Sequence, residues 1–177
     1  MKTTSLLIAG FGGQGTLFAG KVLASASLYK GLEVSWLPSY GPEMRGGTAN
    51  CSVIISDTPI GSPIVSHPEV LIALNKPSFD KYEKLATPGA KVFVDSSLVD
   101  TKSARTDIEV FYVPATELAA GTGSSTLSNI VLVGKMLKET GLFSPEEISE
   151  VFEKLIPERK KAMRELNRKA LEAGFGF

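Results

Sequence analysis

Two glycine-rich segments carry most of the residues whose types and spacing could do chemistry. They are Gly10-Phe11-Gly12-Gly13-Gln14-Gly15 and Tyr40-Gly41-Pro42-Glu43-Met44-Arg45-Gly46-Gly47. Glycine lets the backbone approach another molecule closely, and the second segment adds an acid, a base and an aromatic ring. Such a combination favours binding of an anionic group or of a partner chain.

The first segment, the glycine loop (residues 10–15), fits the G-x-G-x-x-G pattern at Gly10, Gly12 and Gly15. It lies between an expected strand and an expected helix, which is the context that a phosphate-binding turn requires. The acid that should hold a ribose is missing, because Pro38 and Ser39 end the second strand. Three interpretations stay open: a structural turn, a site for some phosphate-bearing ligand, and a nicotinamide or flavin site.

The second segment, residues 40–47, combines Glu43 and Arg45 with Tyr40 and Met44. A surface loop with a local ion pair is one interpretation, and such a pair contributes little to stability. Aromatic residues, methionine and arginine are, however, the residues that the cores of protein interfaces prefer. We therefore expect residues 40–47 to contact a partner chain.

A third polar cluster is Gly121-Thr122-Gly123-Ser124-Ser125-Thr126, followed by Asn129. It opens a helix, so helix capping alone explains it equally well. It also follows a strand end, and Ser124 and Asn129 could complete a phosphate cradle beside the glycine loop.

No nucleophile or acid–base pair emerges from the sequence. The single histidine, His67, has no second histidine or nearby cysteine beside it. Cys51 lies in an apolar strand, where a small core residue is expected, and Asp95 ends a strand, where turn formation is expected. We predict no catalytic residue and no metal ligand in this chain.

Alternating strands and helices must position these residues. Apolar runs and turn signals predict strands at 4–10, 32–37, 48–56, 69–74, 91–95 and 109–113. They predict helices at 16–30, 77–85, 116–140 with an interruption at 121–125, and a helical tail at about 144–173 with a break before Pro157. The pattern is typical of a single α/β domain over 1–177, a Rossmann-like layered fold with a largely parallel central sheet and a C-terminal helical extension. The two glycine segments then open on one edge of the sheet.

Two helix surfaces can be assigned from spacing. Along 16–30, one face is marked by Leu17, Lys21, Ala24 and Leu28, and Phe18, Val22 and Ser25 lie beside it. In the tail, glutamates alternate with Arg159, Arg164 and Arg168, which predicts a solvated face rather than a nucleic-acid site.

Composition excludes several classes of function. The chain has 177 residues, with 19 basic and 19 acidic side chains, so no net field draws it to nucleic acid or membrane. One cysteine excludes a disulfide or a four-cysteine iron–sulfur site within the chain. No signal peptide or membrane span is evident, and we expect a cytoplasmic protein.

The two glycine segments, the following Thr48-Ala49-Asn50-Cys51 and the later Gly61-Ser62-Pro63 together resemble the γ subunit of the 2-oxoacid:ferredoxin oxidoreductases. The resemblance covers nearly the whole chain. It implies a multisubunit enzyme that converts a 2-oxoacid, coenzyme A and oxidised ferredoxin into acyl-CoA, CO₂ and reduced ferredoxin. The chain would be a subunit without the catalytic centre and inactive alone. Thiamine diphosphate and iron–sulfur clusters would be bound by the α, β and, where present, δ subunits.

On this resemblance, the subunit or coenzyme A contacts would fall on the glycine loop and residues 40–47, with Ser124 and Asn129 nearby. The Tyr-Gly-Pro-Glu-Met-Arg-Gly-Gly form is most similar to 2-oxoglutarate and branched-chain 2-oxoacid members. 2-Oxoglutarate ranks first, branched-chain oxoacids or pyruvate second and indolepyruvate third. Two other classes remain: a free-standing dinucleotide-binding oxidoreductase and a ligand-free scaffold subunit. An isolated γ subunit would expose apolar surface, so homodimers are expected when it is alone.

Overall fold

The computed structural model describes residues 3–39 and 48–177, so residues 40–47 lie outside the described part. The strands are β1 (Thr4–Phe11), β2 (Glu33–Ser39), β3 (Thr48–Ser56), β4 (Val70–Ala73), β5 (Lys91–Asp95) and β6 (Glu109–Val113). The helices are α1 (Thr16–Tyr29), α2 (Lys76–Tyr82), α3 (Ala115–Thr122), α4 (Ser128–Thr140), α5 (Pro145–Leu155) and α6 (Lys161–Gly176), with 3₁₀ turns η2 (Glu83–Leu85), η3 (Ser125–Leu127) and η4 (Glu158–Lys160). Each predicted element is present, and β5 and β6 have the predicted bounds.

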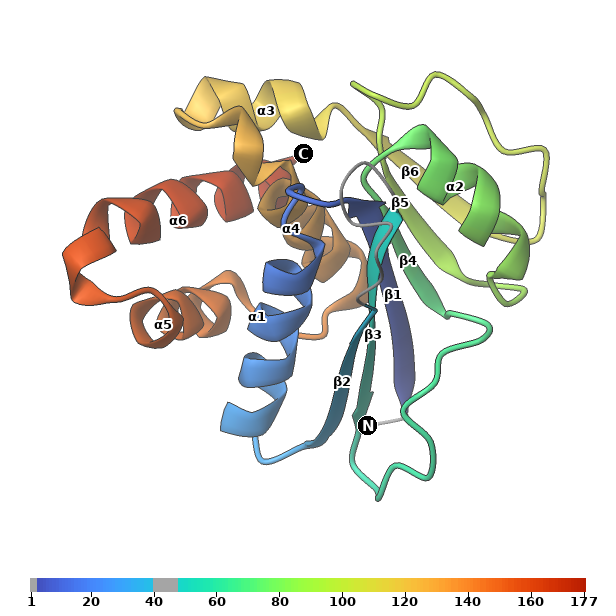
Figure 1. Ribbon diagram of the computed structural model, residues 1–177, viewed down its shortest axis with the longest axis horizontal. Helices are drawn as coiled ribbons and strands as arrows, with labels where there is room; N and C mark the ends of the chain where they lie inside the picture. The colour runs from blue at the N-terminus through green and yellow to red at the C-terminus, as the bar shows by residue number, and fades with distance from the viewer. Residues whose placement is uncertain (1–2, 40–47) are drawn as a thin grey trace.

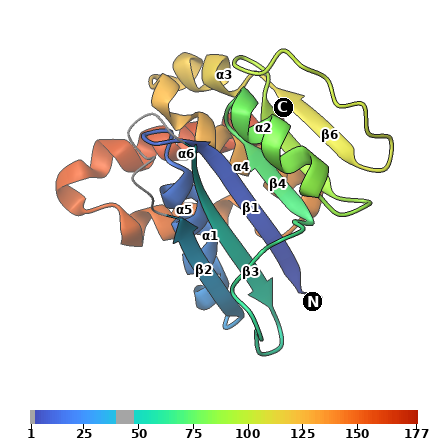
Figure 2. The ribbon, with the colours of Figure 1, turned by 45° about the vertical axis from the view of Figure 1, so that its right-hand side comes forward.

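The strands form one sheet in the order β2-β3-β1-β4-β5-β6. β1, β4, β5 and β6 pair in parallel, which confirms the α/β class and the mostly parallel sheet. β3 is antiparallel to both of its neighbours. The segment β1-α1-β2 is therefore not a simple βαβ unit, because β3 lies between its two strands (Figure 2). Strand alternation cannot reveal this insertion, since a buried antiparallel strand carries the same apolar pattern as a buried parallel one.

The register brings the glycine loop and the two residues that flank segment 40–47 to one edge of the sheet. Phe11, the last residue of β1, pairs with Thr48, the first residue of β3. Ser39, the last residue of β2, pairs with Asn50 in the same region. The two residues that flank the undescribed segment thus lie level with the glycine loop. Glu33 lies at the opposite end of β2, across from Ser56, which is the wrong end to hold a ribose.

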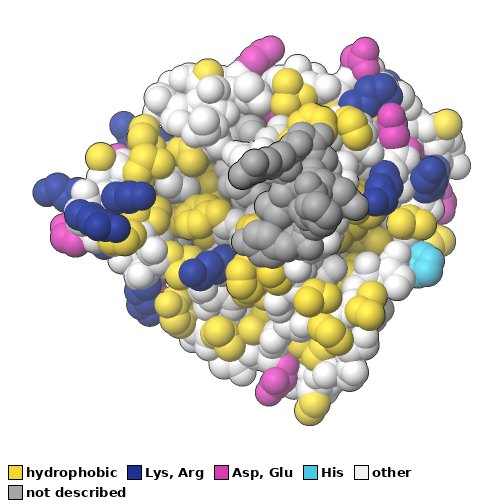
Figure 3. Space-filling model, in the orientation of Figure 1, with side chains coloured by type: hydrophobic (Ala, Val, Ile, Leu, Met, Phe, Trp, Pro, Cys, Tyr) yellow, Lys and Arg dark blue, Asp and Glu magenta, His cyan; other side chains and the backbone are white. Residues whose placement is uncertain are grey.

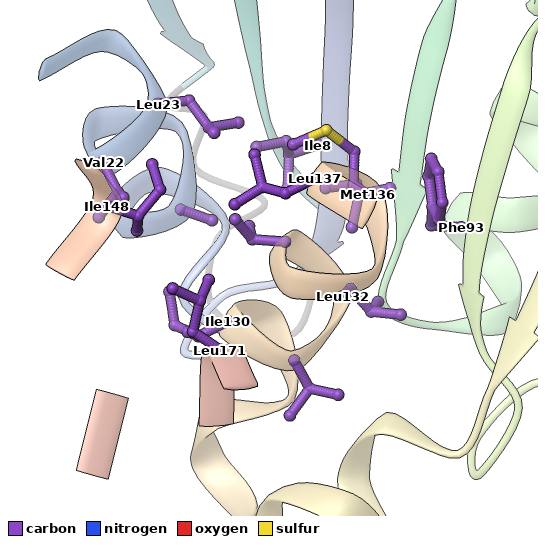
Figure 4. Close-up of a cluster of buried hydrophobic side chains, with 14 of the residues drawn as sticks. Ile8, Val22, Leu23, Phe93, Ile130, Leu132, Met136, Leu137, Ile148 and Leu171 are labelled. Carbon is purple, nitrogen blue, oxygen red and sulfur yellow. The ribbon is translucent and has the colours of Figure 1, made fainter. Parts of the chain in front are cut away.

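Helices cover the two faces of the sheet unequally (Figure 1). One face packs against α1 and α4, with α3, α5 and α6 outside them, and the other packs against α2. Side chains of β1 alternate between the two cores: Leu6 and Ile8 enter the larger, and Leu7 and Ala9 the smaller. Figure 4 shows how Ile8, Leu23, Ile130 and Met136 meet in the larger core.

The face of α1 marked by spacing coincides only in part with the buried one: Ala24 is buried, and so is Val22 beside that face, but Leu28 is exposed. The helix buries Ala19, Val22, Leu23 and Ala26 in the larger core, whereas Leu28 is 61% exposed. The small residues decide this orientation, because a Cβ added at Gly20 would lie 2.4 Å from Sγ of Cys51. The helix therefore approaches the sheet through Ala and Gly, and its larger leucine remains outside.

The helical extension is held by a close crossing of α4 and α6. A Cβ added at Gly134 would lie 2.1 Å from the carbonyl oxygen of Leu171, and one at Gly174 would lie 1.8 Å from that of Val131. The sequence places the end of the tail at about residue 173, but α6 continues to Gly176. Gly174 permits close helix packing here instead of ending the helix.

Two arginines of the extension, Arg164 and Arg168, form ion pairs with acids. Nη1 of Arg164 lies 2.8 Å from Glu153 and 2.6 Å from Glu158, and its Nε and Nη2 donate to the carbonyl oxygen of Ile156. This guanidinium is only 14% exposed. Arg164 therefore fixes the turn between α5 and α6, in addition to carrying surface charge.

Candidate functional site

The glycine loop joins the end of β1 to the start of α1 through two residues in the left-handed region. Gly13 has a φ of 95° and Gly15 a φ of 76°, a conformation that other residues adopt only with strain. Gly15 is also the N-cap of α1, where no side chain caps the helix and no acid lies in the first turn. The first amides of a helix have no intrahelical acceptor, so this end of α1 favours an anion.

Gln14 holds the loop against the sheet. Its Oε1 accepts hydrogen bonds from the backbone N–H of Phe11 (2.6 Å) and from Nδ2 of Asn75 (2.9 Å). Its Nε2 donates to the carbonyl oxygen of Leu74 (3.1 Å). Gln14 was expected at the ligand or partner surface, and the structure engages its amide within the chain instead. Its hydrogen bonds fix the conformation of the glycine loop.

Asn75 extends this network into α2. Its Oδ1 accepts from the backbone N–H of Ser78 at 2.9 Å and so caps α2. The sequence analysis did not single out Asn75. The signal was available, since an asparagine before Lys-Pro at the end of a buried strand is a common helix start.

Asn129 holds the loop from the opposite side. Its Nδ2 donates to the carbonyl oxygen of Gly15 at 2.9 Å, although the two residues are far apart in the chain. A Cβ at Gly15 would lie 2.4 Å from that nitrogen. The structure therefore brings Asn129 to the glycine loop.

Ser124 is placed differently. Its hydroxyl pairs with that of Thr126 at 2.8 Å in an exposed position. Among the described residues it has no hydrogen bond to the glycine loop, and its backbone N–H donates to the carbonyl oxygen of Ala119 in α3. Ser124 thus serves the turn between α3 and η3.

The loop borders two cavities. The larger, of about 370 Å³, lies between the glycine loop, the start of α4 and the turn from α5 to α6. Its lining comprises Gly13, Gly15, Phe18, Thr126, Leu127, Asn129, Leu155, Ile156, Pro157, Lys160, Met163 and Asn167. The smaller, of about 300 Å³, is lined by Gly12, Gly13, Gly15, Thr16, Leu17, Phe18 and Ala49. We call the larger one the loop–extension cavity.

Hydrophobic side chains gather on this face of the molecule, with Lys and Arg at the outer end of the extension (Figure 3). The sequence did not predict that α6 forms one wall of the loop–extension cavity. A signal existed in Asn167, because an amide with Ala170 and Leu171 beside it interrupts an otherwise apolar face.

The remaining candidates have structural roles. Burial raises the pKa of the Cys51 thiol to about 12, while contacts with Trp36 and the Gly20 backbone lower it in part. The thiol donates to the carbonyl oxygen of Thr16 at 3.3 Å. It is therefore neutral at pH 7 and no nucleophile.

Asp95 forms a turn, as predicted. Its carboxylate accepts from the backbone N–H of Ser97 (3.1 Å) and from the hydroxyl of Thr116 (2.6 Å). It therefore joins the end of β5 to the start of α3. His67 is exposed in the loop before β4.

Within residues 3–39 and 48–177, no group of three or more His, Cys, Asp or Glu side chains could hold a metal ion. In the same part of the chain, no helix has the length and apolar character needed to cross a membrane. Tyr40, Gly41, Pro42, Glu43, Met44, Arg45, Gly46 and Gly47 lie outside the described residues.

Comparison with known proteins places this chain in a family. The model for the pyruvate ferredoxin/flavodoxin oxidoreductase family matches residues 5–177. The chain belongs to this family, as the resemblance predicted. The 2-oxoglutarate synthase subunit KorC of Methanocaldococcus jannaschii is 35% identical over 171 residues, covering 95% of this chain and 90% of the relative.

The ketoisovalerate oxidoreductase subunit VorA of Methanothermobacter thermautotrophicus is 40% identical over 169 residues. The match covers 94% of this chain but 35% of VorA, so this chain spans about a third of that relative's length.

Solved structures agree on the fold. The γ subunit of a keto/oxoacid ferredoxin oxidoreductase from Geobacter sulfurreducens has a TM-score of 0.83 at 33% identity, covering 98% of this chain and 96% of its own. The 2-oxoglutarate:ferredoxin oxidoreductase of Magnetococcus marinus has a TM-score of 0.88 at 21% identity, covering 99% of this chain and 31% of its own.

Proposed function

We propose that this chain is the γ-type subunit of a thiamine-diphosphate-dependent 2-oxoacid:ferredoxin oxidoreductase. Its glycine-loop edge would face coenzyme A and the thiamine-binding subunits. Family membership and the near full-length similarity to KorC support this function. The observation that carries the proposal for the site is the uncapped start of α1 at Gly15, level with the residues that flank the segment 40–47.

The physical argument concerns charge and shape. The start of α1 offers free backbone amides and the positive end of the helix dipole, and no acid in its first turn offsets them. Gln14 and Asn129 hold this end in one conformation, so little ordering is needed when an anion binds. A coenzyme A phosphate, or an acid on a partner chain, fits such a site.

In such an enzyme, thiamine diphosphate supplies the decarboxylation chemistry and iron–sulfur clusters carry electrons to ferredoxin, both within partner subunits. This chain contributes contacts and orientation. Residues 40–47 would provide the subunit interface, with Glu43 and Arg45 available for ion pairs across it. We place the assembly in the cytoplasm.

2-Oxoglutarate is the favoured substrate. The sequence form of residues 40–47 supports this choice, and so does the similarity to three 2-oxoglutarate synthase KorC subunits, which covers 90% or more of their length. Branched-chain oxoacids and pyruvate rank next. The thiamine-binding subunits would make most of the choice.

A tagged pull-down from the native host tests the subunit assignment. We expect thiamine-binding and cluster-bearing chains to co-purify, and the fraction to reduce a dye when a 2-oxoacid and coenzyme A are both present. Recovery of this chain alone, without that activity, would contradict the proposal and favour a free-standing nucleotide-binding protein.

Two variants separate coenzyme A binding from scaffolding. Glu43→Ala and Arg45→Ala, purified in the complex, should weaken coenzyme A binding while the subunits stay assembled. If coenzyme A affinity is unchanged in both, the segment is an assembly surface only.

A further inference from the structure

Strand β2 lies at one edge of the sheet and has an open side. Among the strands of the described residues it pairs with β3 alone. The unpaired N–H and C=O groups of an edge strand can accept another strand, and proteins usually block them with charges or proline. In β2 the blocking residues, Glu33 and Pro38, lie toward the two ends of the strand, and residues 34–37 between them carry no charge.

Hydrogen bonds elsewhere in the sheet show which backbone groups of β2 face this open side. The carbonyl oxygen of Ala9 in β1 accepts from the backbone N–H of Leu74 at 2.8 Å, on the side of β4. Backbone groups of successive residues in a strand point to opposite sides. Ile8 therefore faces β3, where it pairs with Cys51, and Cys51 bonds to β1.

The same alternation continues across β3 into β2. Ser52, next to the residue that bonds β1, faces β2 and pairs with Leu37. Because Leu37 bonds to β3, the backbone groups of Val34, Trp36 and Pro38 face away from the sheet. Pro38 agrees with this assignment, since proline is tolerated in an edge strand where its missing N–H would face outward. Val34 and Trp36 thus offer the free donors of the edge.

Apolar side chains of α1 and β2 flank the open edge. Trp36 is 38% exposed and Leu37 42% exposed. The indole lies beside α1, because a Cβ added at Gly20 would be 2.9 Å from Nε1 of Trp36. Gly20 adjoins the face of α1 marked by spacing, whose last residue, Leu28, is exposed. Figure 3 shows hydrophobic side chains over α1 and β2, and exposed apolar surface of this kind is typical of an interface.

We propose that β2 pairs with β2 of a second copy of this chain, antiparallel about a two-fold axis at Ser35. Val34 of each copy then lies opposite Trp36 of the other, and the two residues exchange N–H···O=C bonds in both directions. The two sheets become one continuous sheet, with both α1 helices on the same face. A specific interface buries about 1,200–2,000 Å² in total, so Trp36 and Leu28 contribute their apolar surface as well.

The hydrogen-bonding groups of β2 complement themselves in this register. Pro38 lies opposite Leu32 of the second copy. Pro38 has no N–H, and the N–H of Leu32 already donates to the carbonyl oxygen of Ser27 at 3.0 Å. Neither end of the paired strands therefore leaves a free donor without an acceptor. This match is the reason to assign the edge to a second copy rather than to an unrelated strand.

The side chains are compatible with the same register. Glu33 lies opposite the uncharged Leu37 of the second copy, so no two acids face each other. Trp36 lies opposite Val34, and an aromatic side chain across from a β-branched one is a favourable pair on a sheet. An interface of this kind is isologous, since each copy contributes the same surface.

Pairing through β2 leaves the glycine loops unobstructed. A two-fold axis perpendicular to the sheet reverses the strand directions, so the glycine loops of the two copies lie at opposite ends of the joined sheet. The inference goes beyond the proposed function and does not depend on it. In a complete enzyme, the dimer would bring γ-type chains together in pairs.

Sedimentation velocity of the full chain over a dilution series tests the dimer, together with charge variants at the axis. We expect the wild type to dimerise below about 100 µM. Ser35→Lys and Ser35→Glu each place like charges opposite one another, so the dissociation constant should rise at least about tenfold. An equimolar mixture of the two variants should restore the dimer. A monomeric wild type at about 100 µM, a Ser35→Lys dimer as strong as the wild type, or a mixture that stays monomeric would overturn the proposal.

Residue-resolved hydrogen exchange gives an internal control. The amides of Val34 and Trp36 face outward, so they should exchange at least about tenfold more slowly in the wild-type dimer than in monomeric Ser35→Lys. The amides of Ser35 and Leu37 face β3 and should be protected in both. Equal exchange at Val34 and Trp36 in the dimer and the monomer would contradict pairing through β2.

Two exposed leucines test the contribution of α1. Leu28→Glu should weaken the dimer several-fold, because it places a charge beside the joined edge. Leu98→Glu is the matched control, since Leu98 is also exposed but lies after β5, away from β2. Equal dissociation constants for the two variants would contradict the part assigned to α1.

The dimer and the subunit assignment can fail separately. If the chain dimerises through Ser35 and no thiamine-binding chain co-purifies, the dimer stands and the proposed function fails. If the complex is recovered while the chain alone is monomeric, and the amides of Val34 and Trp36 are protected only in the complex, another subunit occupies the edge. That result overturns the second-copy pairing and leaves the proposed function standing.

Discussion

The glycine loop and the C-terminal extension form opposite walls of one cavity, and they are built in different ways. The loop is short and is fixed by side chains from elsewhere, Gln14 to the sheet and Asn129 to Gly15. The extension is fixed by close helix packing at Gly134 and Gly174 and by the ion pairs of Arg164. The site's shape therefore depends on hydrogen bonds on one wall and on packing on the other.

The two walls should therefore respond differently to mutation. A packing error in the extension should cost global stability, because backbone atoms must move apart. A substitution in the glycine loop should lower the free energy of unfolding less, because a surface loop can shift locally. The variants described next test whether substitutions in the extension lower stability more than substitutions in the glycine loop.

Gly174→Ala should lower the free energy of unfolding by about 3 kcal/mol, since the new methyl group meets the carbonyl oxygen of Val131 at 1.8 Å unless α4 and α6 separate. Urea denaturation measures this loss. Gly176→Ala is the matched control, because nothing lies within 4 Å of a Cβ there. Equal stability of the two variants would show that the helix crossing is looser than the structure indicates.

Gly15→Ala should cost about 2 kcal/mol through its left-handed backbone and its clash with Asn129. Gly13→Ala carries the same backbone strain without a neighbour within 4 Å, so about 1 kcal/mol is expected. Denaturation of both, and of the double variant Gly15→Ala/Asn129→Ala, isolates the contact. If Gly15→Ala and Gly13→Ala lower the free energy of unfolding equally, Asn129 does not constrain the loop.

Ser144→Ala should cost about 1 kcal/mol, because it removes half of the capping box that starts α5. The pKa of Glu147 is lowered, first by the backbone N–H of Ser144 and then by Lys30. The stability from this carboxylate is present above its unfolded pKa and is lost as the pH falls through the lower folded value. Thermal midpoints of the wild type and of Glu147→Gln should therefore converge in acid; a constant gap between them contradicts this.

Cys51 should react with iodoacetamide only when the chain unfolds, because burial raises its pKa to about 12. Its thiol stays protonated in the folded state while the unfolded thiol ionises near 9.0, so this residue lowers stability as the pH rises above that value. Mass spectrometry of the native and urea-unfolded chain measures the labelling. Rapid native labelling at pH 8 would place Cys51 outside the core.

The sequence predicted much of the fold because local signals were strong. Ser144-Pro145-Glu146-Glu147 predicted a capped helix start, and both hydrogen bonds of the capping box form. Lys91–Asp95 and Glu109–Val113 had the predicted bounds as continuous strands. Such signals lie within a few residues of each other, so they can be read without the tertiary structure.

The errors arose where distant segments decide the outcome. The spacing along α1 did not show how the helix packs on the sheet, because Gly20 lies against Cys51 and Trp36, which belong to two other strands. The antiparallel β3 was not foreseen, since an apolar run does not carry a direction. For the site, Asn129 was singled out but Asn167 and Lys160 were not, because the sequence does not show which distant segment the helical tail packs against.

The sequence by itself determined the α/β class, the family, the glycine loop between strand and helix, and the absence of enough cysteines for a cluster. These properties follow from composition and from residues close together in the chain. The tertiary structure alone decided that α6 meets the glycine loop, that Gln14 turns inward, and that two asparagine oxygens lack partners beside one cavity. Hydrogen-bond satisfaction depends on every neighbour in space, so it can be judged only after the chain has folded.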